Sequence, residues 1–190
     1  MVMVRETVPG DWQALRDIRL EALKSAPSAF GSTYEQQAAF GEADWLRRIA
    51  RGGNFLAYLP EASEASEAGE PVGLIGGYPE TADVVELVSM FVRPRARGRG
   101  VGEALVAAVL DWARERAAKT VHLWVTESND HARALYERCG FELTGERQPL
   151  PSDPHQDEVA MARPCEPAPT QSPGTDPKAR PRPKAPAPPR

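Results

Sequence analysis

The chain of 190 residues is long enough for one domain with an appendage, and its 41% hydrophobic and 26% charged content is typical of a soluble globular protein. No stretch is apolar enough to cross a membrane and the first residues lack the apolar core of a signal peptide, so we expect a cytoplasmic protein without a membrane partner. The two cysteines, Cys139 and Cys165, show neither disulfide nor metal-ligand spacing, which argues against a disulfide framework and predicts no metal site.

The net charge of −4 is unevenly distributed along the chain. Residues 164–190 contain ten of the nineteen prolines and carry five Lys or Arg against two acids, so this segment is +3 and residues 1–163 are −7. We predict a folded domain over residues 1–163 and a basic, proline-rich tail over residues 164–190 that is disordered or polyproline-like. The acidic domain argues against a nucleic-acid partner, and it suits either a cationic acceptor or solubility alone.

The N-terminal part of the chain predicts one strand and two helices. The strand covers Met1–Val8 and is broken by Pro9-Gly10. Asp11 is placed to cap a helix from Trp12 to about Lys24, and a second helix is expected from about Gly41 to Ala50. Apolar spacing predicts the buried side of the first helix: Leu15, Ile18, Arg19, Ala22 and Leu23.

Further along, the sequence predicts strands around a central helix. Strands are expected at Asn54–Leu59, Val72–Tyr78, Thr120–Thr126, Phe141–Gly145 and Glu158–Ala162. The acidic repeat at 61–70 is predicted to be a solvated hairpin loop, and the proline-rich segment 146–156 is predicted to be a loop. A short helix over Asp130–Cys139 has Ser128 or Asn129 as its N-cap and ends at Gly140 in the left-handed conformation, with Phe141 contacting Leu135 or Tyr136.

The centre of the chain carries the clearest functional pattern. An apolar strand, Val84–Val92, ends at Pro94 and is followed by the glycine-rich loop Arg97–Gly102, which opens an amphipathic helix. Such a loop suits phosphate binding, because glycines allow close backbone approach and the helix N-terminus carries partial positive charge. The dinucleotide fingerprint G-x-G-x-x-G is absent, because Glu103 occupies the position of its last glycine. The Gly-Lys pair of a P-loop does not occur either. A flexible Arg/Gly loop is the alternative.

This loop has the form R-x-x-G-x-G and closely resembles the acetyl-CoA pyrophosphate loop of the GNAT acetyltransferase superfamily. A second segment, Asn129–Phe141, resembles the family pattern N-x-x-A-x-x-x-Y-x-x-x-G-F at every marker position. The resemblance extends over residues 3–162. It implies the GNAT acyl-CoA N-acyltransferase fold, an α+β architecture in which a mixed central sheet has helices on both faces and the strands around the central helix run parallel.

The resemblance implies acetyl-CoA as cosubstrate. It assigns acetyl-CoA binding to Met90, Phe91, Val92, Arg97, Gly98, Arg99, Gly100, Val101, Gly102, Glu103, Asn129, Ala132, Arg133 and Tyr136. Within this set, the backbone of Phe91 and Val92 would hold the pantetheine arm, and an N–H near Met90 or Phe91 would stabilise the oxyanion. Arg93 and Arg95 either add positive charge for the cofactor or form a solvated turn.

Two side chains are candidates for catalysis. Tyr136 would by resemblance protonate the departing thiolate, although its helical stripe also fits simple core packing. Glu86 lies eleven positions before Arg97, the spacing of the acidic base in histone-type members, and desolvation would raise its pKa towards that of a base. Glu86 is alternatively a solvated strand-end charge, or a substrate anchor if ordered water deprotonates the amine.

The acceptor site is less well marked. In the family the connector at 26–35 overhangs it, which makes Phe30 and Tyr34 substrate-binding candidates together with Glu86, and the loop at 146–157 would frame it. A plain helix–helix connection with both aromatic rings packed for shape is the alternative. His122 and His131 are interpreted as structural, Cys139 as core and Cys165 as part of the tail.

Together these features predict an N-acetyltransferase that moves the acetyl group of acetyl-CoA to a primary amine of an unidentified acceptor, directly, in a ternary complex. Small amines, antibiotic amines and protein amines all remain open. A non-catalytic acyl-CoA-binding sensor of the same fold is the alternative, and the proline-rich tail is a candidate docking segment for another protein. The oligomeric state is open, with a homodimer as one option.

Overall fold

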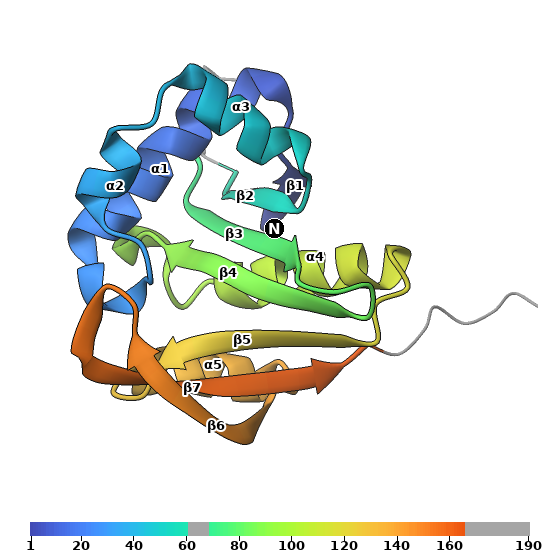
Figure 1. Ribbon diagram of the computed structural model, residues 1–190. Coiled ribbons are helices and arrows are strands. Elements are labelled where there is room, and N and C mark those ends of the chain that lie inside the picture. The colour runs from blue at the N-terminus through green and yellow to red at the C-terminus, as the bar shows by residue number, and fades with distance from the viewer. Residues whose placement is uncertain (61–68, 166–190) are drawn as a thin grey trace, which may run out of the picture.

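The computed structural model describes residues 1–60 and 69–165 (Figure 1). The predicted loop repeat, apart from its last two residues, and almost all of the predicted tail lie outside these residues. Strands alternate with helices in this order: β1 (Met3–Glu6), α1 (Trp12–Ser25), α2 (Tyr34–Ala38), α3 (Glu42–Ala50), β2 (Asn54–Tyr58), β3 (Gly73–Pro79), β4 (Val84–Val92), α4 (Val101–Glu115), β5 (Thr120–Thr126), α5 (Asp130–Arg138), β6 (Glu142–Leu150) and β7 (Asp153–Pro164).

The strands form a single mixed sheet. Its order is β1-β2-β3-β4-β5-β7-β6, and β4 and β5 are its parallel pair while all other neighbours are antiparallel. The helix α4 connects β4 to β5, as the predicted β-helix-β unit requires. The predicted α+β architecture with a mixed sheet is therefore confirmed.

Two apolar cores lie on opposite faces of the sheet. Strand β2 illustrates the division, because Phe55 and Ala57 pack against the helices α4 and α5 while Leu56 and Tyr58 pack against α1 and α3. The five residues predicted to line the buried side of α1 are its five buried residues. In Figure 1, α4 and α5 pass behind the sheet.

A β-bulge interrupts strand β4 in its second half. Leu74 pairs with Phe91 and Gly76 with Val88, so the two residues Ser89 and Met90 lie opposite a single residue of β3. Ser89 takes the left-handed conformation, with φ of 62°. The extra residue reverses the alternation of side chains, so Phe91 packs in the core under α1 instead of the core under α4.

At the N-terminus, two local predictions need correction. Asp11 does not cap α1, because its carboxylate accepts hydrogen bonds from both terminal nitrogens of Arg5, at 2.6 and 2.7 Å, and from the Val8 amide. Two hydrogen bonds from a guanidinium cation to a carboxylate are stronger than one from a neutral backbone amide of the helix. The short helix α2 was not predicted, although Thr33 and Gln36 form the capping box that signals its start.

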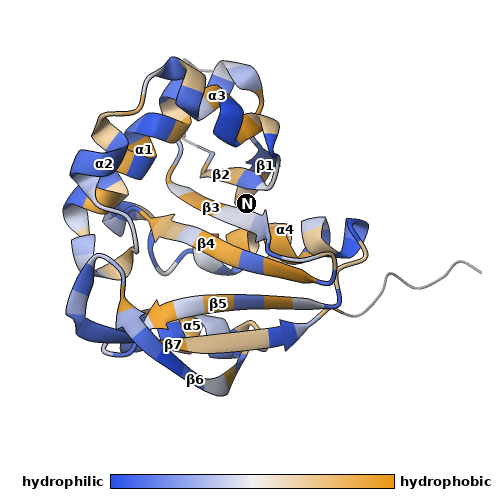
Figure 2. Ribbon diagram, in the orientation of Figure 1, coloured by the Kyte–Doolittle hydropathy of each residue, from blue (hydrophilic) through white to orange (hydrophobic). Residues whose placement is uncertain are grey.

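At the C-terminus, the predicted loop at 146–156 is wrong. Strands β6 and β7 continue through it as a long hairpin that turns at Pro151 and Ser152. Strand β6 is an edge strand with mostly exposed, hydrophilic side chains, so it lacks the apolar alternation that identifies a strand (Figure 2). Edge strands also tolerate proline, which explains Pro149.

The packed domain also extends slightly beyond the predicted boundary. Pro164 is still part of β7, and Cys165 is buried beside α4, with its amide donating to the carbonyl of Lys119. The interpretation of Cys165 as a tail residue is therefore wrong. Cys139 is half-buried and packs at the edge of the core.

Gly53 is where α4 packs most closely on the sheet. It has a φ of +74°, and a Cβ added there would lie 2.5 Å from the carbonyl oxygen of Gly77 and 2.7 Å from the ring of Trp112. A side chain therefore meets both backbone strain and a rigid neighbour.

We predict that Gly53→Ala lowers the free energy of unfolding by about 3 kcal/mol, from overpacking and the left-handed conformation together. Thermal denaturation should show a midpoint roughly 10 °C lower. Gly10→Ala is the matched control, because an added Cβ there meets nothing within 4 Å, and its midpoint should stay close to that of the wild type. Equal midpoints for the two variants would contradict this packing.

Candidate functional site

A cleft of about 620 Å³ opens between the helices α1 and α3 and the sheet. Its floor comes from β3, β4 and β5, and one end reaches β6 and β7. The candidates Phe30, Glu86, Met90 and Tyr136 all line it, so the structure brings together residues that are up to 106 positions apart in the sequence. The cleft therefore holds both catalytic candidates, Glu86 and Tyr136, and two of the three substrate-binding candidates, Phe30 and Glu86.

The cleft exists because β4 and β5 separate. Their parallel pairing covers only the register from Val84↔Thr120 to Glu86↔His122, after which the strands diverge, as Figure 1 shows. Tyr136 belongs to the core on the α4 side of the sheet, yet it lines the same cleft as Glu86. The gap between the strands thus lets a side chain from one face of the sheet meet a cleft on the other.

Local structure at the end of α5 holds Tyr136 in place. The Phe141 amide donates to the Tyr136 carbonyl at 3.0 Å, the Gly140 amide donates to the Glu137 carbonyl at 2.9 Å, and Gly140 has a φ of +82°. These two hydrogen bonds form a Schellman motif. The predicted contact of Phe141 with Tyr136 is present, because the two rings pack edge to face with their centroids 5.9 Å apart. Burial raises the pKa of Tyr136 well above its ordinary value, so the phenol stays protonated at neutral pH.

Glu86 is half-buried on β4. Burial raises the pKa of its carboxyl above the ordinary value, the neighbouring charges of Glu80 and Glu158 raise it further, and His122 lowers it. A carboxylate with a raised pKa in a cleft has the property that a general base needs. The interpretation of Glu86 as a solvated strand-end charge is not favoured by this partly desolvated position.

Glu158 is a second carboxylate in the cleft that sequence reasoning missed. It is 7% exposed at the start of the β7–β5 pairing, and its Oε1 accepts a hydrogen bond from Gln148 at 2.6 Å. Burial raises the pKa of Glu158, and the hydrogen bond from Gln148 partly offsets this shift. The β6–β7 hairpin carries these two side chains to the cleft, and its part that includes Gln148 lies in the segment that the sequence predicts as a loop.

The glycine-rich loop has the geometry of an anion site. Gly98 and Gly100 take φ values of +69° and +77°, and a Cβ at either meets nothing within 4 Å, so the space around the loop is open. Within the described part of the chain, the amides from Gly98 to Gly102 donate no hydrogen bond. These amides open α4, where the helix dipole favours a negative charge. The loop residues therefore fit a diphosphate.

Residues of this loop also make contacts within the domain. Gly102 is needed for packing, because a Cβ there would lie 3.0 Å from Leu135 and 3.3 Å from Met90. The Nε of Arg97 donates to the Val92 carbonyl at 3.2 Å, and the carboxylate of Glu103 pairs with Arg138.

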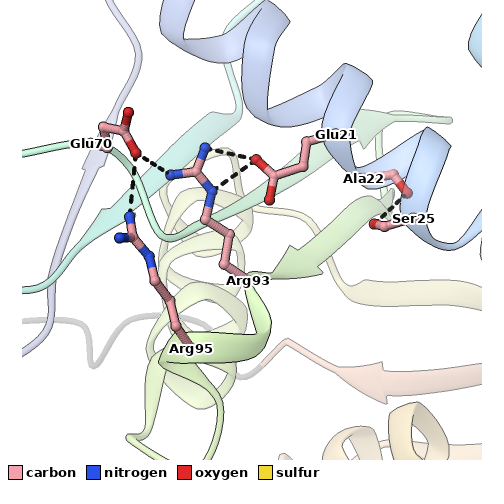
Figure 3. A network of polar contacts seen from close by, with 6 residues as sticks. All are labelled: Glu21, Ala22, Ser25, Glu70, Arg93 and Arg95. Atoms are coloured by element: carbon pink, nitrogen blue, oxygen red, sulfur yellow. Dashed lines mark hydrogen bonds and ion pairs between the residues drawn. The ribbon is translucent and has the colours of Figure 1, made fainter.

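Arg93 and Arg95 do not contribute free positive charge for a cofactor. Figure 3 shows the guanidinium of Arg93 between Glu21 and Glu70, at 2.7 and 2.8 Å, and that of Arg95 turned to Glu70. The network ties the end of β4 to α1. Glu21 and Glu70 neutralise the charge of Arg93 locally. The ion pairs therefore give both arginines a structural role.

In the second motif, Asn129–Phe141, most of the side chains make contacts that stabilise the fold. Asn129 caps α5 as predicted, with its Oδ1 accepting from the Ala132 amide at 3.1 Å. Arg133 donates to the carbonyl of Glu127, while its Nε is buried without a partner among the described residues. Ala132 packs against the core of α4.

The structure separates the two aromatic substrate candidates. Phe30 is buried and lines the cleft, but Tyr34 lines a second cavity of about 670 Å³ with Lys24 and Asp153. This cavity lies on the other side of the connector between α1 and α2. The connector itself is tied to the sheet, because Thr126 Oγ1 donates to the Ser28 carbonyl at 2.7 Å and Ser152 Oγ to the Phe30 carbonyl at 2.5 Å.

The family model described as "Acetyltransferase (GNAT) family" matches residues 12–141, which is more than half of the chain. The chain belongs to the GNAT acetyltransferase family. The matched range covers the loop, the cleft-forming strands and Tyr136, and it stops before the β6–β7 hairpin that brings Glu158 into this GNAT cleft.

A known N-acetyltransferase resembles this chain in sequence. The chain is 38% identical over 80 residues to an uncharacterized N-acetyltransferase of Methanocaldococcus jannaschii, a match that covers 39% of this chain and 35% of that one. The chain therefore spans about a third of the length of that relative.

Two solved structures show the same fold. The GNAT acetyltransferase of Streptococcus pneumoniae has a TM-score of 0.68 at 17% identity, covering 87% of this chain and 100% of that chain. A Salmonella typhimurium protein solved with its cofactor acetyl-CoA has a TM-score of 0.66 at 17% identity, covering 87% and 95%.

Two further observations bear on the environment of this GNAT domain. Among the helices that the structure describes, none has the length and hydropathy needed to span a bilayer. Across residues 1–60 and 69–165, His, Cys, Asp and Glu side chains do not gather in groups of three or more that could bind a metal.

We predict that Glu158→Gln stabilises the protein near neutral pH. A raised carboxyl pKa means that the folded state favours the protonated form, so stability is lost as pH rises through the folded pKa. The neutral amide avoids that loss and should add up to about 1 kcal/mol at pH 7–8. Chemical denaturation at pH 4 and pH 7.5 checks the sign, because the gain should shrink at the lower pH. A variant less stable than wild type at pH 7.5 would contradict it.

Proposed function

We propose that this GNAT chain is an acetyl-CoA-dependent N-acetyltransferase that transfers the acetyl group directly to a primary amine in a ternary complex. The observation that carries the proposal is the cleft that Glu86 and Tyr136 both line, beside the gap between β4 and β5. Family membership, the N-acetyltransferase relative and the acetyl-CoA of the Salmonella typhimurium structure support the same reaction.

The loop between Arg97 and Glu103 would hold the diphosphate of acetyl-CoA. Free amides, positive-φ glycines and the N-terminus of α4 provide hydrogen-bond donors and partial positive charge without the need for a lysine. The pantetheine arm would follow the edge of β4 beyond Glu86, where β5 no longer pairs with it. Bound acetyl-CoA supplies the activated acetyl thioester; the other functions come from this chain.

The gap between β4 and β5 would also place the reacting groups. Near the bulge, an amide of Met90 or Phe91 lies where the regular ladder is interrupted, which favours it as the donor to the developing oxyanion. Glu86 would accept the proton that the attacking amine must lose, because an ammonium has no lone pair. The nearby Glu158 would attract the ammonium before that step.

Tyr136 would then protonate the departing thiolate. Its raised pKa keeps the proton on the phenol until the thiolate forms. Direct transfer is favoured over a covalent acetyl-enzyme because, in the described ranges, neither cysteine lines the cleft. The acceptor amine is therefore the nucleophile that attacks the thioester.

We expect the purified chain to release coenzyme A thiol from acetyl-CoA in an amine-dependent way, measured with a thiol reagent over a panel of primary amines. Tyr136→Phe should lower kcat by about tenfold to a hundredfold without abolishing turnover, because a thiol of pKa about 8.5 leaves fairly well unaided. Gly10→Ala is a control far from the cleft. Acetyl-CoA binding without turnover of any amine would favour the sensor alternative, and no binding would refute the proposal.

We predict that kcat/KM of the wild type falls with decreasing pH through the pKa of Glu86, because the base must be ionised and burial raises that pKa above its usual range. Glu86→Gln should remove this limb of the profile and lower kcat by about a hundredfold or more. If Glu86 is only an anchor, KM rises while kcat and the profile stay unchanged.

A further inference from the structure

Two arginines of the cleft that are withdrawn from solvent have no acidic partner among the described residues, whereas the third unpaired arginine of the cleft, Arg51, is exposed. Arg19 on α1 and Arg48 on α3 both line it, and neither forms an ion pair with any residue that the structure describes. Buried guanidinium groups are usually paired with a carboxylate or phosphate, because removing them from water is unfavourable. These two side chains therefore lack the partner that their position calls for.

Arg19 is the more deeply buried of the two, with 4% of its surface exposed. Its Nε donates to Gln37 Oε1 at 3.0 Å, and its guanidinium lies 4.6 Å above the ring of Phe30. Its Nη1 is buried without a hydrogen-bond partner in the described chain. One neutral amide and one aromatic ring leave the charge of Arg19 uncompensated and its Nη1 donor unsatisfied.

Arg48 has only neutral partners as well. Its Nε donates to Asn54 Oδ1 at 3.1 Å, and one terminal nitrogen donates to Ser89 Oγ at 2.9 Å. Burial lowers the pKa of Arg19 to about 9 and that of Arg48 to about 10, and the charge of Arg48 contributes to the shift of Arg19. Both groups remain cationic at neutral pH, so the cleft carries uncompensated positive charge beside α1 and α3.

The opposite part of the cleft carries negative charge. Glu86 on β4 and Glu158 on β7 line it, and Glu158 contributes to the raised pKa of Glu86. An acceptor that bears only amines would compensate the two carboxylates and leave the two arginines unpaired. A ligand with one charge of each sign compensates both parts of the cleft.

We propose that the acceptor is a small amine that also bears a carboxylate, with its carboxylate bound by Arg19 and Arg48 and its amino group directed to Glu86 and Glu158. This inference rests on the proposed function and names its substrate class. A carboxylate is favoured because the planar guanidinium matches it in a two-pronged hydrogen bond. A small acceptor is favoured because the hydrogen bonds of Thr126 and Ser152 tie the connector over the cleft and restrict its opening.

The test compares the twenty amino acids with their carboxamides, and phosphoethanolamine with ethanolamine, by thiol release. For at least one amino acid, kcat/KM should exceed that of its amide at least tenfold. Arg19→Gln should lower kcat/KM for the acid at least tenfold and that for the amide by less than twofold, and Arg19→Lys should retain part of the preference. Arg16→Gln, which removes the same charge from an exposed position of α1 outside the cleft, should leave the ratio unchanged.

A binding measurement separates this inference from the reaction itself. Thermal shift of the protein with coenzyme A, in the presence of each amino acid or amide, reports carboxylate binding even if no amine is acetylated. Stabilisation by an acid, absent with its amide and lost in Arg19→Gln, supports the inference whether or not turnover occurs. Equal turnover or equal shifts for acids and amides, or a preference for phosphoethanolamine over every amino acid, would overturn it. Equal losses of kcat/KM for the acid and its amide in a folded Arg19→Gln variant would also overturn the inference.

Discussion

The short parallel pairing of β4 with β5 is the constraint on which the rest of the site depends. Three register pairs join the strands, and beyond Glu86 the twist of the sheet and the bulge at Ser89 carry β4 away from its neighbour. The separation creates the cleft, exposes an edge of β4, and lets Tyr136 reach from the α4 side. A continuous ladder would bury all three features in an ordinary sheet.

The net charge of the chain conceals how charge is distributed within this cleft. The net charge of the chain is −4, yet the cleft places two partly or fully buried arginines opposite two carboxylates with raised pKa values. Each buried charge without a partner lowers stability, and a site that binds a charged ligand is where such groups are found. The acidic charge of the domain suits either a cationic acceptor or solubility alone, whereas the local charges of the cleft favour an acceptor that carries both signs.

Prediction from the sequence succeeded where short-range rules decide the structure. Pro94, the glycines of the loop and the apolar spacing of α4 define the β-helix-β unit locally, and Asn129 and Gly140 delimit α5 in the same way. It failed in the second half of β6, beyond Gly145, because an edge strand in water has no apolar face to recognise, and at Asp11 because Arg5 offers a stronger partner than the helix. Tyr34 lines the second cavity instead of the cleft, and the sequence did not separate it from Phe30 because nothing local indicates which side of a connector a ring will face.

The amino-acid sequence by itself indicated the family, most of the order of the elements, the glycine-rich loop, and Glu86 and Tyr136 as separate candidates, because each of these is recognised from a few neighbouring residues. Only the tertiary structure decided that Glu158, Arg19 and Arg48 share one cleft with them. Those three side chains come from a strand and two helices that are far apart in the sequence. Their proximity follows from the order of the strands and the packing of helices on both faces of the sheet, which no local pattern records.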